Sequence, residues 1–473
     1  MNVIDANAAA YRIAFSADGQ AQIAGRGGVA TPDQRFYIGD KVIAHAFATR
    51  IPAYLADLVD VALAVYLADR LAPRRAPSAD RYHLHWNRYL HLTLPVRDVR
   101  RWRDPLLQTR LRDVLALLTE DAWEFDFVPR SGQRRIAEMQ GYLFPNRPQA
   151  PLSAALFSGG LDSLAGLCHQ LAVRPDHSFV LFCGGTSQRS IGVQRTLASV
   201  LPIRLKRSIT PVVVPFGLRQ RGKRQYDGDE RTQRSRAFAF QCLGAATAAL
   251  AGGEELEIYE HGIGALNLPY TAAQLGTQST RATDPRVLAA MGDFVSLAID
   301  QPFAFRLPFF AFTKAELCAS VRDASLVDLI RRTFSCDGFP QRVAGRPQCG
   351  LCTSCLLRRQ ALHAAELADH DARDSYVADV LAEEGRLTAA KSYPLRAMLD
   401  QVDTLRRALD ESDPWSSLSR AYPQLLEVAS CLAATGLTRA DTERRIVDLY
   451  RRYCDEWRHF PVRRAGSIAA HAA

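Results

Sequence analysis

One short loop combines the residue types that hold a phosphate group. It reads Ser158, Gly159, Gly160, Leu161, Asp162 and Ser163. The glycines let backbone N–H groups approach an anion closely, and a helix that begins after them directs its positive end to the same place. The hydroxyls of Ser158 and Ser163 can donate to phosphate oxygens, and Asp162 can hold Mg²⁺ against them. The loop therefore predicts a pyrophosphate-binding site with Asp162, Ser158 and Ser163 as its catalytic residues.

The context of this loop supports that interpretation. A small, apolar strand pattern at 154–157 precedes it, and an apolar helix pattern follows from Leu164. The alternative is an ordinary turn between a strand and a capped helix. No Gly-Lys-Ser/Thr follows, so this is not a Walker-type loop. The loop resembles the SGGxDS loop of the PP-loop ATP pyrophosphatases, which split ATP into AMP and pyrophosphate while adenylating a substrate.

A second motif consists of four cysteines: Cys336, Cys349, Cys352 and Cys355. Thiolates at this spacing can close a tetrahedron around zinc, which favours a structural metal site. The alternatives are buried thiols or a disulfide pair, and a disulfide fits poorly because no signal peptide is recognised at the start of the sequence. We expect the remaining six cysteines to lie in the core: Cys168, Cys183, Cys242, Cys318, Cys431 and Cys454.

The two motifs together resemble one family. Over residues 150–365 the chain resembles the QueC family of 7-cyano-7-deazaguanine synthases, and among them the larger QatC-type proteins of bacterial anti-phage systems. The resemblance implies that the loop at 158–163 binds ATP and Mg²⁺ and that the four cysteines bind Zn²⁺. It also implies adenylation of the carboxylate of 7-carboxy-7-deazaguanine, followed by attack of ammonia or, in defence-system relatives, of an amine on a protein.

Adenylation brings two anions together, so we expect cations near the loop. Arg236 follows Arg234 at the start of a helical run over 235–251 and is a candidate for phosphate or carboxylate contact. Smaller family members have an Arg-Asn pair near this place, and a solvated basic face is the alternative. Lys314 follows Thr313 at a helix start with capping-box spacing. It either contacts phosphates or is the first exposed residue of that helix.

A strand pattern at 256–260 ends in a loop that suggests a substrate site. Glu260 could accept the paired N–H donors of a guanine-like edge, and the backbone of Gly262 could approach the same ring. Asn267 completes the predicted substrate-binding set. The alternative is a capped turn with a surface acid. His261 is not assigned a catalytic role, and the loop at 280–285 is expected on the substrate side.

The elements that must position these residues suggest three segments. Over 150–365, strands alternate with helices, which predicts an α/β fold with a parallel sheet, Rossmann-like as in PP-loop proteins. Over 1–145, a hairpin at Asp18-Gly19, a helix at 54–71 and alternating strands at 90–96 and 123–127 predict an α+β accessory domain. The Pro-rich stretch 145–151 separates the two. Residues 366–473 read as a helical extension, whose last helix has an apolar stripe that packs on the catalytic domain or docks a partner.

Composition is consistent with a cytoplasmic enzyme. The chain has 473 residues, 48% of them hydrophobic, and a net charge of +9, which allows nucleotide or nucleic-acid binding without requiring it. No apolar run is long enough to span a bilayer. The favoured hypothesis is a defence-system enzyme that passes an activated deazapurine to an amine, with a protein acceptor encoded beside it. A nitrile-forming synthase and a nucleotide-binding subunit without turnover are the alternatives. The sequence leaves the oligomeric state open.

Overall fold

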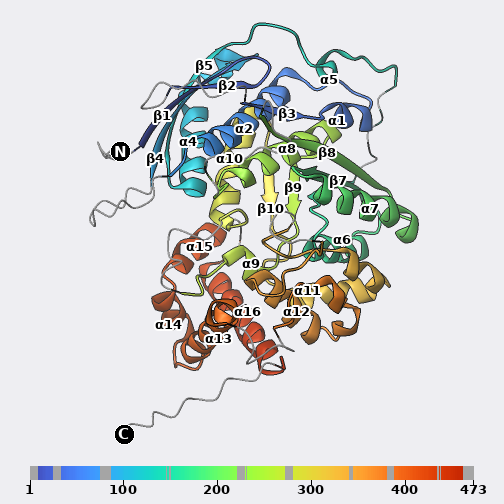
Figure 1. Ribbon diagram of the computed structural model, residues 1–473, viewed down its shortest axis with the longest axis vertical. Helices are drawn as coiled ribbons and strands as arrows, with labels where there is room; N and C mark the ends of the chain where they lie inside the picture. The colour runs from blue at the N-terminus through green and yellow to red at the C-terminus, as the bar shows by residue number, and fades with distance from the viewer. Residues whose placement is uncertain are drawn as a thin grey trace. The chain divides into compact units, whose positions relative to one another are not determined.

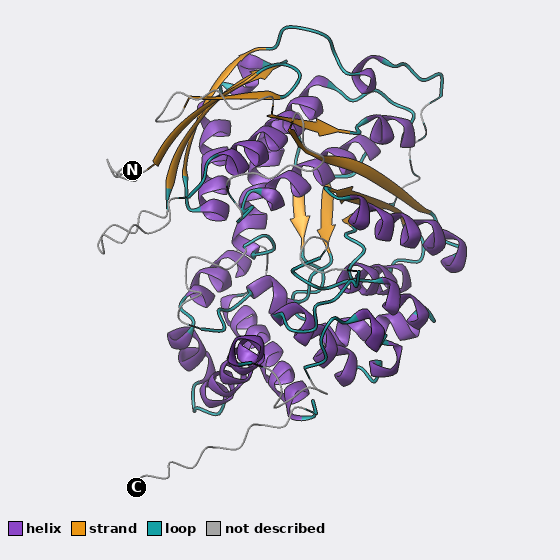
Figure 2. Ribbon diagram, viewed as in Figure 1, coloured by secondary structure: helices purple, strands orange, loops and turns teal. Residues whose placement is uncertain are grey.

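The structure is a computed structural model in which the chain forms two compact units. It describes residues 9–24, 34–74, 87–144, 151–220, 232–271, 281–339, 345–380, 388–433 and 438–461, with the single residues 146, 148, 230 and 436. One unit comprises Met1–Ser158, Asp176–Ile258 and Thr280–Arg306, and the other Gly159–Pro175, Tyr259–Ser279 and Leu307–Ala473. We call them the sheet unit and the helical unit, because all ten strands assigned among the described residues belong to the first (Figure 2).

The sheet unit is built on a single sheet with the order β10-β9-β6-β7-β8-β3-β2-β1-β4-β5 (Figure 1). Its strands are β1 Ala9–Phe15, β2 Gln20–Ala24, β3 Gln34–Ile38, β4 Arg88–Val96, β5 Ala122–Pro129, β6 Leu152–Leu156, β7 Ser178–Gly185, β8 Ile209–Gln220, β9 Glu255–Ile258 and β10 Ala304–Arg306. The predicted strands at 154–157, 179–182, 212–216 and 256–260 thus correspond to β6, β7, β8 and β9.

Strands β6 to β10 form the parallel part of the sheet. β6 pairs with β7 on one side and with β9 on the other, in both cases parallel, with Leu156 opposite Ile258 of β9. The chain therefore runs outward from β6 through β7 and β8, and then returns to the other side of β6 for β9 and β10. Open parallel sheets bind ligands where the strand order reverses in this way. The loops that leave β6 and β9 carry Asp162 and Glu260.

The N-terminal strands belong to the same sheet. β1 and β2 form the predicted antiparallel hairpin, and β1 also pairs in parallel with β4, which pairs with β5. Side chains of β4 and β5 alternate between buried and more exposed, as their sequence pattern predicts. β3 then pairs antiparallel with β8, with Ile38 opposite Phe216, and this pairing joins the N-terminal strands to the parallel part.

Helices on the sheet unit supply most of its remaining core. They are α1 Lys41–Ala46, α2 Ala53–Leu71, α3 Val99–Trp102, α4 Pro105–Thr119, α5 Ile136–Met139, α7 Gln188–Leu205, α8 Arg236–Ala251 and α10 Pro285–Ile299. α2 is buried along nearly its whole length, including Leu58 and Leu67. α8 approaches β6 so closely that a Cβ on Gly244 would lie 2.5 Å from Leu156 Cδ2, which explains the glycine.

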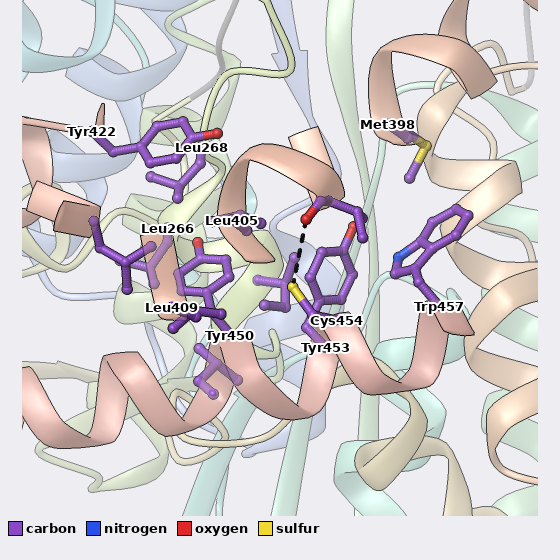
Figure 3. Close-up of a cluster of buried hydrophobic side chains, with 14 of the residues drawn as sticks. Leu266, Leu268, Met398, Leu405, Leu409, Tyr422, Tyr450, Tyr453, Cys454 and Trp457 are labelled. Carbon is purple, nitrogen blue, oxygen red and sulfur yellow. Dashed lines mark hydrogen bonds between the residues drawn. The ribbon is translucent and has the colours of Figure 1, made fainter. Parts of the chain in front are cut away.

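The helical unit contains the first helix after the Gly-rich loop and the C-terminal helices. These are α6 Leu161–Val173, α9 Gly262–Leu266, α11 Lys314–Asp323, α12 Thr353–Ala364, α13 Ala389–Leu409, α14 Pro414–Ala421, α15 Gln424–Ala433 and α16 Arg439–Arg458, with 3₁₀ turns η2 Val327–Arg332, η3 Ala368–His370 and η4 Arg373–Ser375. Figure 3 shows Tyr450, Tyr453 and Trp457 of α16 packed with Leu405 and Met398 of α13. The apolar stripe of α16 is thus buried within its own chain, against the other C-terminal helices α13, α14 and α15 as well as against α9 and α12 of the predicted catalytic segment.

The observed class is α/β with a mostly parallel ten-stranded sheet and many helices. The division into segments 1–145, 150–365 and 366–473 stays a prediction, as does the assignment of the PP-loop fold. Several predicted regions, including parts of the stretches 145–151 and 280–285, lie outside the described residues. Among the described helices, none combines the length and the apolar character that a bilayer crossing requires.

Candidate functional site

The Gly-rich loop leads directly into a helix, as predicted, but the helix begins at Leu161 and not at Leu164. Gly159 has a φ of 80°, a left-handed conformation that glycine adopts without strain. Gly160 is the N-cap of α6, and Asp162 lies in the first turn of that helix. Gly160 also forms a parallel bridge with Phe334, so the loop is fastened to the segment that precedes Cys336. The first turn of α6 therefore has backbone N–H groups and a carboxylate held at one place.

Lys314 forms an ion pair with Asp162. Its Nζ donates to both carboxylate oxygens of Asp162, across 152 residues of sequence. The Lys314 side chain is 5% exposed and that of Asp162 is 21% exposed, so the alternative of an exposed Lys314 is wrong, whereas its contact with phosphates stays a prediction. The chain contains only five lysines, in contrast to its many arginines. A buried lysine is therefore an unusual choice here, and it supplies a compact point charge with three rotatable donors.

Glu260 and His261 lie beside this ion pair. His261 Nδ1 accepts the N–H of Gly264 at 3.1 Å, which caps α9. His261 Nε2 lies 3.3 Å from Glu260 Oε1 and 3.9 Å from Asp162 Oδ1. In a neutral imidazole with Nδ1 as acceptor, the proton is on Nε2. His261 thus directs an N–H at the two carboxyl groups.

Burial and charge set the protonation states of this cluster. Burial together with the neighbouring charge of Asp162 raises the pKa of Glu260 to about 8. Burial and the Lys314 ammonium lower the pKa of His261 to about 3. Burial is the largest single effect on Asp162 and would raise its pKa, but the charge and hydrogen bond of Lys314, together with other positive charges nearby, hold that pKa below its usual value. Near neutral pH the cluster therefore holds one carboxylate, one ammonium, a neutral imidazole and a mostly protonated Glu260.

The same cluster could hold a metal ion. Ligand atoms of Asp162, Glu260 and His261 all lie within 4.8 Å of one another. His261 is poorly prepared as a ligand, because a metal on Nε2 would force the proton to Nδ1, where it would face the Gly264 N–H donor. The two carboxyl groups offer the hard oxygen atoms that Mg²⁺ prefers. Of the two, Asp162 is the residue that would hold Mg²⁺ here, because its pKa is lowered whereas that of Glu260 is raised.

Two predicted ATP-binding residues belong to the sheet unit. The Ser158 carbonyl accepts from Gln194 Nε2 at 3.2 Å. Arg236 begins α8, with its guanidinium carbon 5.3 Å from the centre of the Phe240 ring. Because these residues and Lys314 lie in different units, a joint ATP site that includes them stays a prediction. Arg234, two residues before Arg236, is paired with Glu120 at 3.2 Å. Its side chain is mostly buried, so Arg234 is not part of a solvated face.

The N-terminal segment fixes the start of α8. Asp69 of α2 accepts from the backbone N–H of Ser235 at 3.0 Å and from its hydroxyl at 2.7 Å. The Asp69 carboxylate is itself paired with buried Arg88 of β4 at 2.5 Å. This anchoring was not predictable from local patterns, because Asp69 and Ser235 are 166 residues apart in the chain. The N-terminal segment therefore has a direct part in placing Arg236.

The predicted substrate loop is a short helix. Gly262 begins α9, where a Cβ would lie 2.0 Å from the carbonyl oxygen of Phe310, so packing alone requires glycine. Asn267 is the C-cap of α9 at a φ of 41°. Asparagine tolerates this left-handed conformation better than most residues. Contacts of Glu260, Gly262 and Asn267 with a substrate stay predictions.

The four cysteines form a compact cluster that could bind zinc. All four Sγ atoms lie within 4.8 Å of one another, with 3.8 Å between Cys349 and Cys355 and 3.9 Å between Cys352 and Cys336. Tetrahedral Zn–S bonds of about 2.3 Å place sulfur atoms about 3.8 Å apart. Cys349 Sγ also accepts the N–H groups of Leu351 and Cys352 at 3.4 and 3.3 Å. These contacts favour the thiolate form that a metal needs.

Surrounding residues hold the cluster in place. Gly350 has a φ of 81°, and a Cβ there would lie 1.9 Å from the Ala378 carbonyl oxygen. Gln348 is buried and its Oε1 accepts from the Ser335 N–H at 3.3 Å. Arg358 of α12 is buried, with its Nε 3.1 Å from Asp371 and its NH1 2.8 Å from Thr333. Five of the other six cysteines are buried as expected, whereas Cys431 is only half-buried.

Comparison with known proteins relates part of the chain to one family. Residues 282–366 match the family model described as queuosine biosynthesis protein QueC. The matched segment contains Lys314 and all four cysteines of the cluster, whereas the Gly-rich loop and Glu260 lie outside it. The match supports a QueC-like relationship and suggests an ATP-using, ligase-like enzyme. No curated protein matches the chain.

Proposed function

We propose that this protein is a QueC-like carbon–nitrogen ligase that uses ATP to adenylate a carboxylate related to 7-carboxy-7-deazaguanine. The observation that carries the proposal is the ion pair between Lys314 and Asp162. It connects the Gly-rich loop, which the family model does not cover, with the segment that it does cover. The Gly-rich loop and the start of α11, which come from different parts of the sequence, therefore meet in one cluster of the helical unit.

In the proposed reaction a carboxylate oxygen attacks the α-phosphorus of ATP and pyrophosphate leaves. The nitrogen of an amine then attacks the acyl carbon, loses a proton and displaces AMP. Lys314 would leave Asp162 to neutralise phosphate charge, and Asp162, ionised near neutral pH, would hold Mg²⁺. Glu260 would bind the N–H edge of the deazapurine. We further propose that the amine belongs to a protein of an anti-phage system, as in the QatC-type relatives.

Isotope labelling tests the activation step. The purified protein is incubated with ATP, Mg²⁺ and 7-carboxy-7-deazaguanine labelled with ¹⁸O in its carboxylate, with ammonium or with proteins encoded beside it. Adenylation predicts AMP that carries one ¹⁸O. Label in inorganic phosphate with release of ADP would show an acyl phosphate instead and would refute adenylation.

The nitrogen-containing product tests the second half of the proposal. A mass increase on a neighbouring protein supports conjugation, whereas a nitrile formed from ammonium without any partner identifies the biosynthetic type of synthase. Absence of both AMP and ADP under all conditions would contradict an ATP-using role with this substrate.

A further inference from the structure

Helix α11 begins with a complete capping box, and Lys314 is its first residue. The Thr313 hydroxyl oxygen accepts the N–H of Glu316 at 3.2 Å, and a Glu316 carboxylate oxygen accepts the N–H of Thr313 at 2.7 Å. The cap fixes the direction in which the first turn of α11 leaves the preceding chain. The place of the Lys314 ammonium therefore depends on how Thr313 is held.

The Thr313 hydroxyl donates a hydrogen bond to α16, the last helix among the described residues. Thr313 is fully buried, and its Oγ1 donates to Glu456 Oε1 of α16, 143 residues away in sequence. The other carboxyl oxygen of Glu456 accepts from Gln360 Nε2 of α12 at 3.2 Å. A buried hydroxyl that loses its acceptor is costly, so this bond ties α16 to the start of α11.

Helix α16 supports the other side of the same cluster. Leu449 of α16 lies so close to Gly262, the residue after His261, that a Cβ there would be 2.5 Å from Leu449 Cδ2. Arg452 donates from NH2 to the carbonyl oxygen of Ala311 at 2.6 Å. The Gly262 N–H in turn donates to the carbonyl oxygen of Phe312 at 3.0 Å. Helix α16 thus contacts both segments that lead into the Asp162 cluster, the one at 261–262 and the one at 311–313.

We propose that Glu456 is a positioning residue for Lys314, which acts by holding the Thr313 hydroxyl and so keeps the Lys314 ammonium on Asp162. The consequence for catalysis rests on the proposed function, but the contact itself does not. The C-terminal helix is then part of the framework of the site. Its acidic residue orients a cation that it does not touch.

Chemical labelling of lysine tests the positioning directly. Amine acetylation followed by mass spectrometry reports the accessibility of each lysine, and exposed Lys41, Lys206 and Lys391 serve as internal references. Thr313→Val removes the hydroxyl at constant volume and should raise the labelling rate of Lys314 about tenfold, with the reference lysines unchanged. Glu456→Ala should do the same, whereas Thr313→Ser should restore the rate of the unmodified protein.

A matched variant separates positioning from loss of stability. Thr442→Val also removes a buried hydroxyl from α16, one that bonds only the carbonyl oxygen of Thr438 at 3.1 Å among the contacts described. It should lower the melting temperature without raising Lys314 labelling. An unchanged labelling rate in Thr313→Val, or an equal rise in Thr442→Val, would overturn the proposal.

ATP turnover supplies the functional readout. Thr313→Val should raise the KM for ATP about tenfold, and Thr313→Ser should recover it. An unchanged KM beside increased labelling would remove the link between positioning and catalysis. If the unmodified protein releases neither AMP nor ADP, the proposed function fails, while the labelling results still decide whether Glu456 holds Lys314.

Discussion

The protonation of Glu260 gives a prediction that needs no ligand. Its pKa of about 8 lies about 3.5 units above the value of 4.5 expected for an exposed glutamate. The unfolded chain therefore loses the Glu260 proton between pH 4.5 and 8, while the folded chain keeps it, so this residue reduces stability progressively as the pH rises. Each unit of pKa difference corresponds to about 1.4 kcal/mol, which makes the full loss at most about 5 kcal/mol above pH 8.

Glu260→Gln should remove this loss, because glutamine resembles the protonated acid and keeps an acceptor for the His261 N–H. The variant should therefore gain stability relative to the unmodified protein between pH 5 and pH 9. With an unfolding entropy of about 2.1 cal/mol/K per residue, a chain of 473 residues that unfolds as a whole gains at most about 5 °C in melting temperature. Thermal unfolding monitored at both pH values measures this difference.

The control is Glu411→Gln at an exposed position, which should show no such pH dependence. A melting-temperature difference for Glu260→Gln that stays constant from pH 5 to pH 9, or that falls, would refute a protonated Glu260.

The same protonation state predicts that a guanine-like ligand, which needs the ionised carboxylate, releases about 0.9 proton on binding at pH 7. Calorimetry in buffers of different ionisation enthalpy would detect this release.

Three further variants test the loop and the cysteine cluster. Cys352→Ser should lower the zinc content and the melting temperature together, and an unchanged ratio of zinc to protein would rule out a four-cysteine site. Gly350→Ala should also lose zinc, because its new Cβ would collide with Ala378, whereas Gly345→Ala, at a φ of 74° with open space around it, should keep the metal. Asp162→Asn should abolish ATP cleavage in a protein that stays folded by circular dichroism; retained turnover would contradict a role for Asp162 in holding Mg²⁺.

Local patterns were sufficient to predict most of the elements that carry the candidate site. The change from strand to helix periodicity at Gly159-Gly160 locates β6 and α6, and Thr313 with Glu316 locates the start of α11. The spacing of the cysteines likewise predicts a cluster that the structure forms. The first two signals, and the spacing of Cys349, Cys352 and Cys355, depend on residues a few positions apart, which is the range over which propensity and capping act.

Contacts between distant segments were not predictable in this way. The pairing of Lys314 with Asp162 depends on how α6 and α11 pack, and the sequence indicates only that each helix exists. Helix α9 was missed because its five residues, Gly262–Leu266, are too few to show a helical period. Alternating apolar and polar residues identified the N-terminal strands, but this pattern does not indicate which strand each one pairs with. One continuous sheet across the stretch 145–151 was therefore not anticipated.

The pairing of β3 with β8 has a consequence for synthesis of the chain. β3 ends at Ile38 and β8 begins at Ile209, so about 170 residues are translated between the two partners. At ribosomal rates of about 5–20 residues per second, β3 waits about 10–30 s for its partner. During that interval its open edge can pair with other nascent chains. Misassembly of this protein should therefore depend on how fast the intervening segment is translated, even when the finished sheet is stable.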